Sequence, residues 1–134
     1  MVSKKFKRHL AIFTGDTIDK ILSGQKTIES RFSRQKIAPF GQVAKGDLIL
    51  MKQSGGKLRG QFLVDKTIFF DHPSTQDVQL IKNKYAQEIA VDEKFWLRHE
   101  GACYITLIFI THPTAFLVEP FKIPKKDLRG WVVL

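Results

Sequence analysis

The spacing of apolar residues changes several times along the chain, and each change predicts a different element. Short apolar or alternating runs bounded by glycine, proline or aspartate are typical of strands. Apolar residues three and four positions apart, as at Ile18, Ile21 and Leu22, are typical of a helix with one buried face. We therefore expect helices over residues 17–23, after Ser74 and from Asp92 to Gly101, and strands over residues 9–14, 27–32, 48–51, 58–70, 102–110, 116–118 and 131–133.

Glycine and proline mark the ends of these elements. Gly24 follows the first helix, where a left-handed residue commonly ends one, and Ser54-Gly55-Gly56 predicts a hairpin turn. These residues with Lys57 could also cradle a phosphate, but no helix follows them, which favours the plain hairpin. Gly60 lies inside a predicted strand and indicates a bulge or a close backbone approach. Three prolines argue against long regular structure before the last strand: Pro113, Pro120 and Pro124.

The order of the predicted elements is strand, helix, several strands, two helices and more strands. This order fits an α+β fold, a mixed β-barrel with a few short flanking helices, better than a doubly wound parallel sheet. A chain of 134 residues with 43% hydrophobic residues is the size of one domain, which we place at residues 9–134. No apolar run approaches the roughly 20 residues that span a bilayer, so we expect a cytoplasmic protein with no membrane contact.

The chain is strongly basic, with a formal net charge of +9 and an isoelectric point near 9.8. Such a surface attracts polyanions, which indicates RNA, DNA or a nucleotide as a partner. Part of the charge lies in a basic N-terminal tail, residues 1–8, and the rest belongs to the domain. The alternative is a protein-interaction module whose charge only aids solubility. The cationic clusters are Lys4, Lys5, Lys7 and Arg8 near the start and Lys122, Lys125, Lys126 and Arg129 near the end.

Cysteine and histidine give no sign of metal chemistry. Cys103 is the only cysteine, and it alternates with apolar residues of a predicted strand, so we expect a buried small side chain. The histidines have no ligand spacing, so we expect no metal site and no cofactor: His9, His72, His99 and His112.

Polar residues that could take part in binding or catalysis are concentrated between residues 24 and 31. If residues 27–32 form a strand, Thr27, Glu29 and Arg31 share one face, and Ile28 and Ser30 lie on the other. An ammonium, a hydroxyl, a carboxylate and a guanidinium would then converge, because Lys26 lies directly before the strand. Such a group could bind a polar planar ligand. The alternative is a solvated salt bridge between Glu29 and Arg31 with no function.

The segment Gly24-Gln25-Lys26-Thr27-Ile28-Glu29-Ser30-Arg31 and the later pair Gly46-Asp47 resemble the signature of the ASCH domain family. That signature is Gly-x-Lys-x-x-Glu-x-Arg followed by Gly-Asp, and all six fixed positions are present here. The similarity covers nearly the whole chain from His9 onward. It implies a β-barrel related to PUA domains, with a positively charged cleft beside the motif and a role in RNA binding.

In a binding role, Lys26 and Arg31 would hold a phosphate or a base edge, and Glu29 would accept a hydrogen bond from an exocyclic amine. An aromatic side chain would stack on the base. Phe95 and Trp96 are candidates for stacking, although aromatics in a short helix are more often core. The full set of expected nucleic-acid or nucleotide contacts is Gly24, Lys26, Glu29, Arg31, Arg34, Lys52 and Arg59.

The resemblance also implies a second role, because small bacterial ASCH proteins include metal-independent amidohydrolases that remove the acyl group of N4-acetylcytidine with a lysine, a threonine and a distal glutamate. Lys26 matches the lysine, while the threonine of those enzymes lies three residues later, where this chain has Glu29. In this role Lys26 would be the base, Thr27 the nucleophile, and Glu29 or Glu88 the carboxylate that relays the proton.

Overall fold

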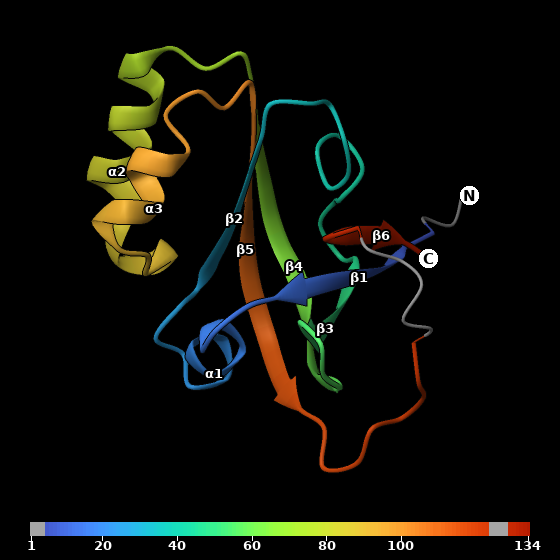
Figure 1. Ribbon diagram of the computed structural model, residues 1–134. Helices are drawn as coiled ribbons and strands as arrows, with labels where there is room; N and C mark the ends of the chain where they lie inside the picture. The colour runs from blue at the N-terminus through green and yellow to red at the C-terminus, as the bar shows by residue number, and fades with distance from the viewer. Residues whose placement is uncertain (1–4, 124–128) are drawn as a thin grey trace.

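The computed structural model describes residues 5–123 and 129–134, and this part of the chain forms six strands and three helices (Figure 1). The first four residues of the predicted tail, and Pro124, Lys125 and Lys126, lie outside the described residues. The elements in order are β1 (Arg8–Phe13), α1 (Thr17–Leu22), β2 (Ile28–Ser33), β3 (Leu48–Gln53), β4 (Leu58–Asp71), α2 (Thr75–Ile89), α3 (Glu93–Arg98), β5 (Tyr104–Ala115) and β6 (Trp131–Val133).

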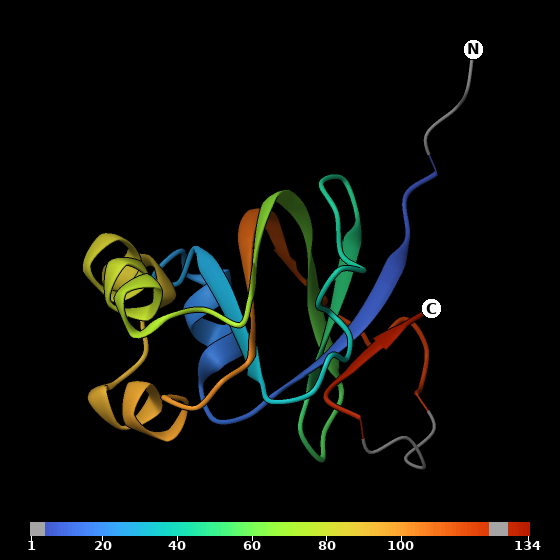
Figure 2. The same cartoon turned by 90° about the horizontal axis from the view of Figure 1, so that it is seen from above.

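All six strands belong to one mixed sheet in the order β2-β5-β4-β3-β1-β6. β1 and β3 are parallel, and the other neighbours are antiparallel. The sheet curves strongly into a half-barrel, with α2 and α3 together on one side of it (Figures 1 and 2). The predicted α+β barrel with short flanking helices is confirmed. β2 and β6 are its two edges, so the barrel has an open seam between them.

Three apolar clusters pack on the two faces of this sheet, and the two larger ones lie in the barrel interior and under α2 and α3. The barrel interior holds the buried side chains of the sheet together with Ile18 and Ile21 of α1, as the helical spacing predicted. The second core lies between the sheet and the pair α2 and α3, and it contains Ile28, Ile81 and Trp96. None of the helices in the described ranges is long and apolar enough to cross a membrane.

The predicted helix starts depend on local sequence and are largely confirmed. Ser74 caps α2 in a reciprocal capping box, in which its side chain accepts from the Asp77 N–H and the Asp77 carboxylate accepts from the Ser74 N–H. Asp92 caps α3 by accepting from the Phe95 N–H at 2.9 Å. Asp16 precedes α1, but its side chain makes no capping bond.

The predicted strand over residues 116–118 is wrong, because β5 itself continues through Pro113 to Ala115. Thr114 pairs with Gln61 and Thr111 pairs with Leu63, so the register shifts at the two residues between them. This irregularity accommodates Pro113, since a residue at a bulge does not need to donate to the ladder. The expectation that Pro113 excludes regular structure is therefore wrong too. Phe116 leaves the sheet and packs on the outer faces of β1 and β3.

The predictions for the β3–β4 hairpin are confirmed. Gly55 has a φ of +70° at the turn, and the Gly56 N–H donates to the Gln53 carbonyl at 2.8 Å. Gly60 lies at an irregularity in the β3–β4 pairing, where a Cβ atom would stand 2.6 Å from the Thr114 carbonyl oxygen. Only glycine allows β4 and β5 to approach this closely.

The Gly46-Asp47 pair anchors the start of β1. Gly46 has a φ of +92°, and the Phe6 ring occupies the space where a Cβ atom would lie. The buried Asp47 carboxylate accepts the Lys7 N–H through Oδ1 at 3.0 Å and the His9 ring through Oδ2 at 2.8 Å. The end of the predicted tail is thus tied to the domain.

Candidate functional site

Arg31 crosses the open seam of the half-barrel. From β2 its Nη2 donates to the Ile12 carbonyl of β1 at 2.9 Å, and its Nη1 donates to the Gly130 carbonyl before β6 at 3.3 Å. Its Nε donates to Glu29 Oε2 at 3.0 Å. The two edges of the sheet are therefore joined by a side chain and not by a backbone ladder.

Aromatic rings fix the guanidinium in this position. The Cζ atom of Arg31 lies 4.9 Å from the ring centroid of Phe13 and 5.2 Å from that of Trp131. Both contacts have cation–π geometry. Three of the five N–H groups of Arg31 are used within the described residues, and its side chain is 22% exposed, so the guanidinium is held firmly and still reaches solvent.

Lys26 is buried at the head of β2, with 2% of the residue exposed. Gly24, with a φ of +83°, reverses the chain after α1, and the Lys26 N–H then donates to the Lys20 carbonyl at 3.0 Å. The Lys26 ammonium donates to the Ile89 carbonyl at the end of α2 and lies 3.4 Å from Glu29 Oε1. The helix-to-strand turn thus directs a lysine inward.

The environment of Lys26 lowers its pKa. Burial removes water from the ammonium and is the main cause; Glu29 acts in the opposite direction, and the positive charges of Arg31 and Lys20 add to the lowering. A lysine with a lowered pKa has a larger fraction of neutral amine, the form that can accept a proton, than an exposed lysine has.

Glu29 is the centre of this cluster. Its Oε1 accepts the Ser30 N–H at 3.0 Å and faces Lys26, while its Oε2 accepts only from Arg31 among the described residues. Only 7% of the Glu29 side chain is exposed. The predicted shared face of Glu29 and Arg31 is confirmed, and their contact is part of a buried network and not a solvated surface pair.

A hollow of about 410 Å³ opens beside this cluster, along the free edge of β2. We call it the motif hollow, and the residues that matter for its chemistry are Lys20, Lys26, Glu29, Ser30, Phe95 and His99. Ser30 is 5% exposed, and its hydroxyl has no hydrogen-bond partner among the described residues. A buried hydroxyl without a partner is uncommon, and a water or a ligand atom can be its partner.

Aromatic rings form one wall of the motif hollow. His99 stacks on Phe32 with centroids 5.3 Å apart and lies 4.4 Å from the Phe95 ring. Burial lowers the pKa of His99, and the charge of Arg98 lowers it further. Arg98 also lines the hollow, so a basic group lies next to the aromatic wall.

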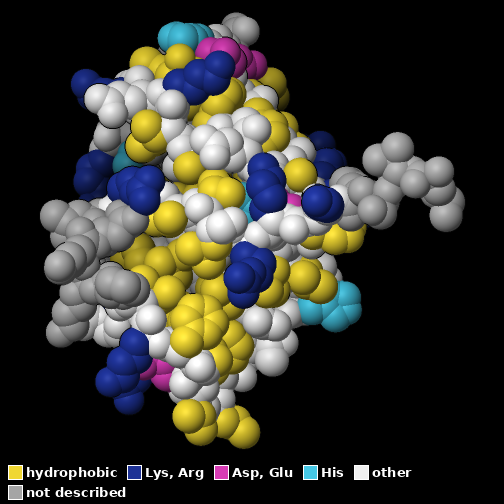
Figure 3. All heavy atoms as spheres, turned by 90° about the vertical axis from the view of Figure 1, so that its right-hand side faces the viewer, with side chains coloured by type: hydrophobic (Ala, Val, Ile, Leu, Met, Phe, Trp, Pro, Cys, Tyr) yellow, Lys and Arg dark blue, Asp and Glu magenta, His cyan; other side chains and the backbone are white. Residues whose placement is uncertain are grey.

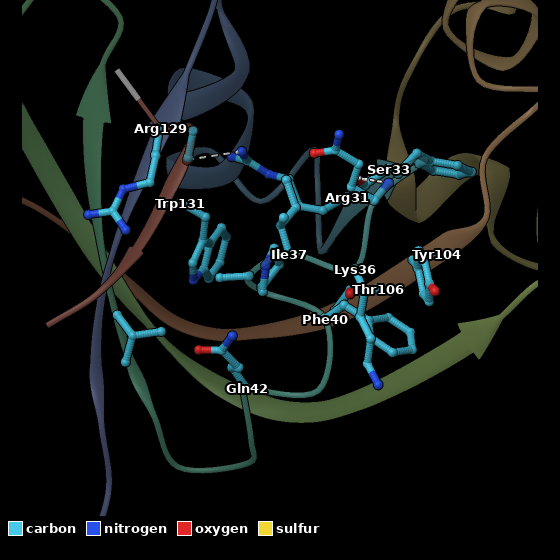
Figure 4. Close-up of a pocket in the computed structure, with 16 residues that line it drawn as sticks. Arg31, Ser33, Lys36, Ile37, Phe40, Gln42, Tyr104, Thr106, Arg129 and Trp131 are labelled. Atoms are coloured by element: carbon cyan, nitrogen blue, oxygen red, sulfur yellow. Dashed lines mark hydrogen bonds between the residues drawn. The ribbon is translucent and has the colours of Figure 1, made fainter. Parts of the chain in front are cut away.

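A second hollow, of about 720 Å³, lies on the other side of Arg31. We call it the tryptophan hollow. Figure 4 shows Trp131 on one wall and Phe40 and Tyr104 on the opposite wall, and Lys36 and Gln42 also line the hollow. Arg31 and Phe32 line both hollows and form the partition between them.

Thr27 lies apart from the other motif residues. Its N–H donates to the Glu88 carbonyl at 2.9 Å, β2 begins only at Ile28, and the exposed Thr27 side chain lines a shallow hollow with Gly24 and Glu88. The expected shared face of Thr27 with Glu29 is therefore not formed. The hydroxyl-bearing residues that line the same hollow as Lys26 are Thr14, Thr17 and Ser30, and among the described residues only the Ser30 hydroxyl is buried without a partner.

The remaining predicted contacts lie outside both hollows. Arg59 pairs with Asp19 of α1 at 2.5 Å, the Lys52 ammonium lies 3.4 Å from the Gln53 carbonyl, and Arg34 is exposed beside Gly101. Of the two aromatic candidates, Phe95 lines the motif hollow, and Trp96 is buried in the outer core.

Three lining residues escaped sequence reasoning: Lys20, Arg98 and His99. They come from α1 and from α3 and its end, and nothing in their local sequence indicates that these elements meet β2. Cys103, expected to be buried, is partly exposed. Within residues 5–123 and 129–134, no cluster of three histidine, cysteine, aspartate or glutamate side chains could hold a metal ion.

Comparison with known proteins identifies the fold. No family model and no curated protein sequence matches the chain. The crystal structure of ASCH from Zymomonas mobilis is similar, with a TM-score of 0.67 and 17% identity over 96% of this chain and 87% of that one. A serine-to-alanine variant of that protein gives a TM-score of 0.70 and 16% identity over 96% and 88% of the two chains. A hypothetical protein gives 0.52 and 19% identity over 78% and 96%.

Proposed function

We propose, from the premise that the chain has the α+β, PUA-like fold of an ASCH domain, that it binds single-stranded RNA and seats one base in the motif hollow. The observation that carries the proposal is the buried Ser30 hydroxyl, which lines the hollow and has no partner among the described residues. The motif hollow has a volume of about 410 Å³, which is within the range of small-ligand sites.

The polar groups of the hollow suit a base with an exocyclic amine. Glu29 Oε2 accepts one hydrogen bond, from Arg31, and a carboxylate oxygen can accept a second. An amine of adenine, cytosine or guanine would donate to this oxygen, and the Ser30 hydroxyl would donate to or accept from a neighbouring ring atom. Sequence-specific RNA recognition commonly uses unstacked bases in this way.

Stacking and charge support the same ligand. The rings of Phe95 and His99 offer a wall on which a base can stack. Figure 3 shows the side of the molecule away from α2 and α3, where Lys and Arg side chains lie around apolar ones and Asp and Glu side chains are fewer. A polyanion would be attracted to such a surface, with an affinity that falls as salt rises.

Ser30→Ala tests this proposal without disturbing the fold. Removing a hydroxyl that has no partner in the described part of the chain should leave the free energy of unfolding within about 1 kcal/mol of wild type, while losing one ligand bond should weaken RNA binding by roughly fivefold. Fluorescence anisotropy with labelled single-stranded RNA, at low and at physiological salt, measures the affinity. The matched control is Ser54→Ala in the exposed hairpin turn, which should bind like wild type. Salt-independent or absent binding, or an unchanged Ser30→Ala affinity, would contradict the proposal.

The lowered pKa of Lys26 favours one alternative function, metal-independent hydrolysis of an acylated nucleoside such as N4-acetylcytidine. Neutral Lys26 would take a proton from a water or from the Ser30 hydroxyl as that oxygen attacks the acyl carbon, and Glu29, whose Oε1 lies 3.4 Å from the Lys26 Nζ, would relay the proton to the amine as the C–N bond breaks. If Ser30 is the nucleophile, a water would then cleave the acyl ester and release the acyl group as a carboxylate. Ser30 replaces Thr27 in this scheme because Thr27 lines a different hollow.

Incubation with N4-acetylcytidine separates this alternative from simple binding. A hydrolase would release cytidine, detected by chromatography, and Lys26→Met would abolish the release while circular dichroism still reports a folded chain. If wild-type protein binds the nucleoside and releases no cytidine, the hydrolase is excluded and the binding function stands.

A further inference from the structure

The two hollows are neighbouring compartments of one seam, divided by Arg31 and Phe32. Both are large enough for a nucleoside, at about 410 and 720 Å³. Arg31, the part of the divider that carries charge, is 22% exposed, and its Nη1 and Nη2 each donate one bond within the described residues. Each of these nitrogens has a second hydrogen with which to contact an anion.

The two compartments differ in charge. The motif hollow has the carboxylates of Glu29 and Asp92 among its cations. The described residues that line the tryptophan hollow include the cations Arg31, Lys36 and Arg129, and no carboxylate is among them. A phosphate would therefore be favoured on the tryptophan side of Arg31, while the carboxylate side suits a base with amine donors.

The tryptophan hollow also has what a second base requires. Trp131 forms one wall, and Phe40 and Tyr104, whose centroids lie 4.9 Å apart, form the opposite wall (Figure 4). The amide of Gln42 and the hydroxyl of Thr106 add groups that can donate and accept hydrogen bonds. Aromatic walls with amide and hydroxyl groups are the usual surroundings of an unstacked RNA base.

We propose that the tryptophan hollow is a second nucleotide subsite, so that single-stranded RNA straddles Arg31 with one base in each hollow and the linking phosphodiester beside the guanidinium. This inference rests on the proposed function, because it takes the motif hollow as the seat of the first base. It makes a dinucleotide, and not a nucleoside, the smallest ligand that uses the whole site.

The test compares cytidine with the dinucleotide CpC, and adenosine with ApA, on the full chain by chemical-shift titration of backbone amides. Each dinucleotide should bind at least about tenfold more tightly than its nucleoside and should shift the amides of Lys36 and Gln42, which the nucleoside leaves unmoved. Lys36→Glu should remove most of the dinucleotide advantage and lower the salt dependence, by about 0.7 in the log–log slope for each lost phosphate contact.

Lys57→Glu is the matched control, because it makes the same charge change in the exposed hairpin, outside both hollows. If nucleoside and dinucleotide bind equally and Lys36→Glu matches Lys57→Glu, the second subsite is refuted and the first stands. If neither ligand shifts the amides of Glu29 and Ser30, the proposed function itself fails, and the second subsite fails with it.

Discussion

Replacing Glu29 with alanine is expected to lower the free energy of unfolding by about 3–5 kcal/mol, the loss typical of removing one partner from a buried ion pair. Without the carboxylate, the buried Lys26 ammonium would keep, among residues 5–123 and 129–134, only the Ile89 carbonyl as a partner. Arg31 would also lose its bond from Nε to Glu29. Urea unfolding followed by tryptophan fluorescence measures the change, because Trp96 and Trp131 are buried.

The decrease in the free energy of unfolding caused by Glu29→Ala should depend on pH, and the direction of this dependence would identify the buried Lys26 as its cause. The pKa of Lys26 is already lowered in the folded protein, and removing Glu29 removes the group that opposes this lowering. Between the folded pKa and the unfolded value near 10.4, the unfolded chain binds more protons, so stability rises with pH in that interval. The variant should therefore regain stability as pH rises towards the unfolded value, and over a wider pH interval than wild type, because its folded pKa is lower.

Two further variants isolate the buried charge. Glu93→Ala removes an exposed carboxylate that pairs with Lys82 on the surface, and it should cost less than about 1 kcal/mol. The double variant Glu29→Ala with Lys26→Met should recover most of the loss, because no unpaired charge is left inside. If Glu29→Ala costs no more than Glu93→Ala, or if the double variant is less stable than the single one, the buried network does not have the role described for it.

Elements that depend on local sequence could be predicted, and elements that depend on distant pairing could not. Ser74 and Asp92 start helices because each caps residues three positions along the chain. The continuation of β5 through Pro113 depends instead on its register with Gln61 and Leu63 of β4, some fifty residues away. No local pattern shows a register shift, so the sequence by itself predicts that regular structure ends before the proline.

The candidate site, too, could be predicted where it depends on local sequence and not where it depends on distant elements. Alternation along the strand correctly placed Glu29 and Arg31 on one face. It could not show that β2 is an edge strand, and at an edge the residues of both faces can line one hollow, which is why Ser30 escaped notice. Thr27 was misplaced because the Glu88 carbonyl of α2 binds its N–H before the strand begins. The alternation of residues shows which side chains share a face of β2, but it does not show which other elements pack beside β2 and complete the site.

Asp47, in the Gly46-Asp47 pair of the signature, belongs to a chain of buried hydrogen bonds, and replacing it is the second change with a large expected effect on stability. The Trp131 Nε1–H donates to His9 Nδ1 at 2.9 Å, so His9 carries its hydrogen on Nε2 and donates it to Asp47 Oδ2 at 2.8 Å. Asp47 also accepts the N–H groups of Lys7 and Ala44 at 3.0 Å. This chain fixes Trp131, the ring that lies against Arg31 and lines the tryptophan hollow.

Asp47→Asn is therefore expected to cost about 2–4 kcal/mol at pH 7. An asparagine amide can offer its oxygen to His9 or to Lys7, but its NH₂ group must then face the other donor. Burial alone would raise the pKa of Asp47, but the hydrogen bonds from Lys7, His9 and Ala44 outweigh burial and hold the pKa below its usual value. The advantage of the carboxylate is thus complete above about pH 4 and is lost as pH falls through the folded pKa.

The difference in unfolding free energy between wild type and Asp47→Asn should accordingly shrink below about pH 4, as measured by urea unfolding across the acid range. Asp65→Asn is the control, because Asp65 is exposed on β4, and it should stay within about 0.5 kcal/mol of wild type at pH 7. Near-ultraviolet circular dichroism should also change in Asp47→Asn and not in Asp65→Asn, since only the first loosens Trp131. A difference that is constant across the acid range would mean that the ionised carboxylate does not hold β1, and that Gly46-Asp47 serves the fold only as a turn.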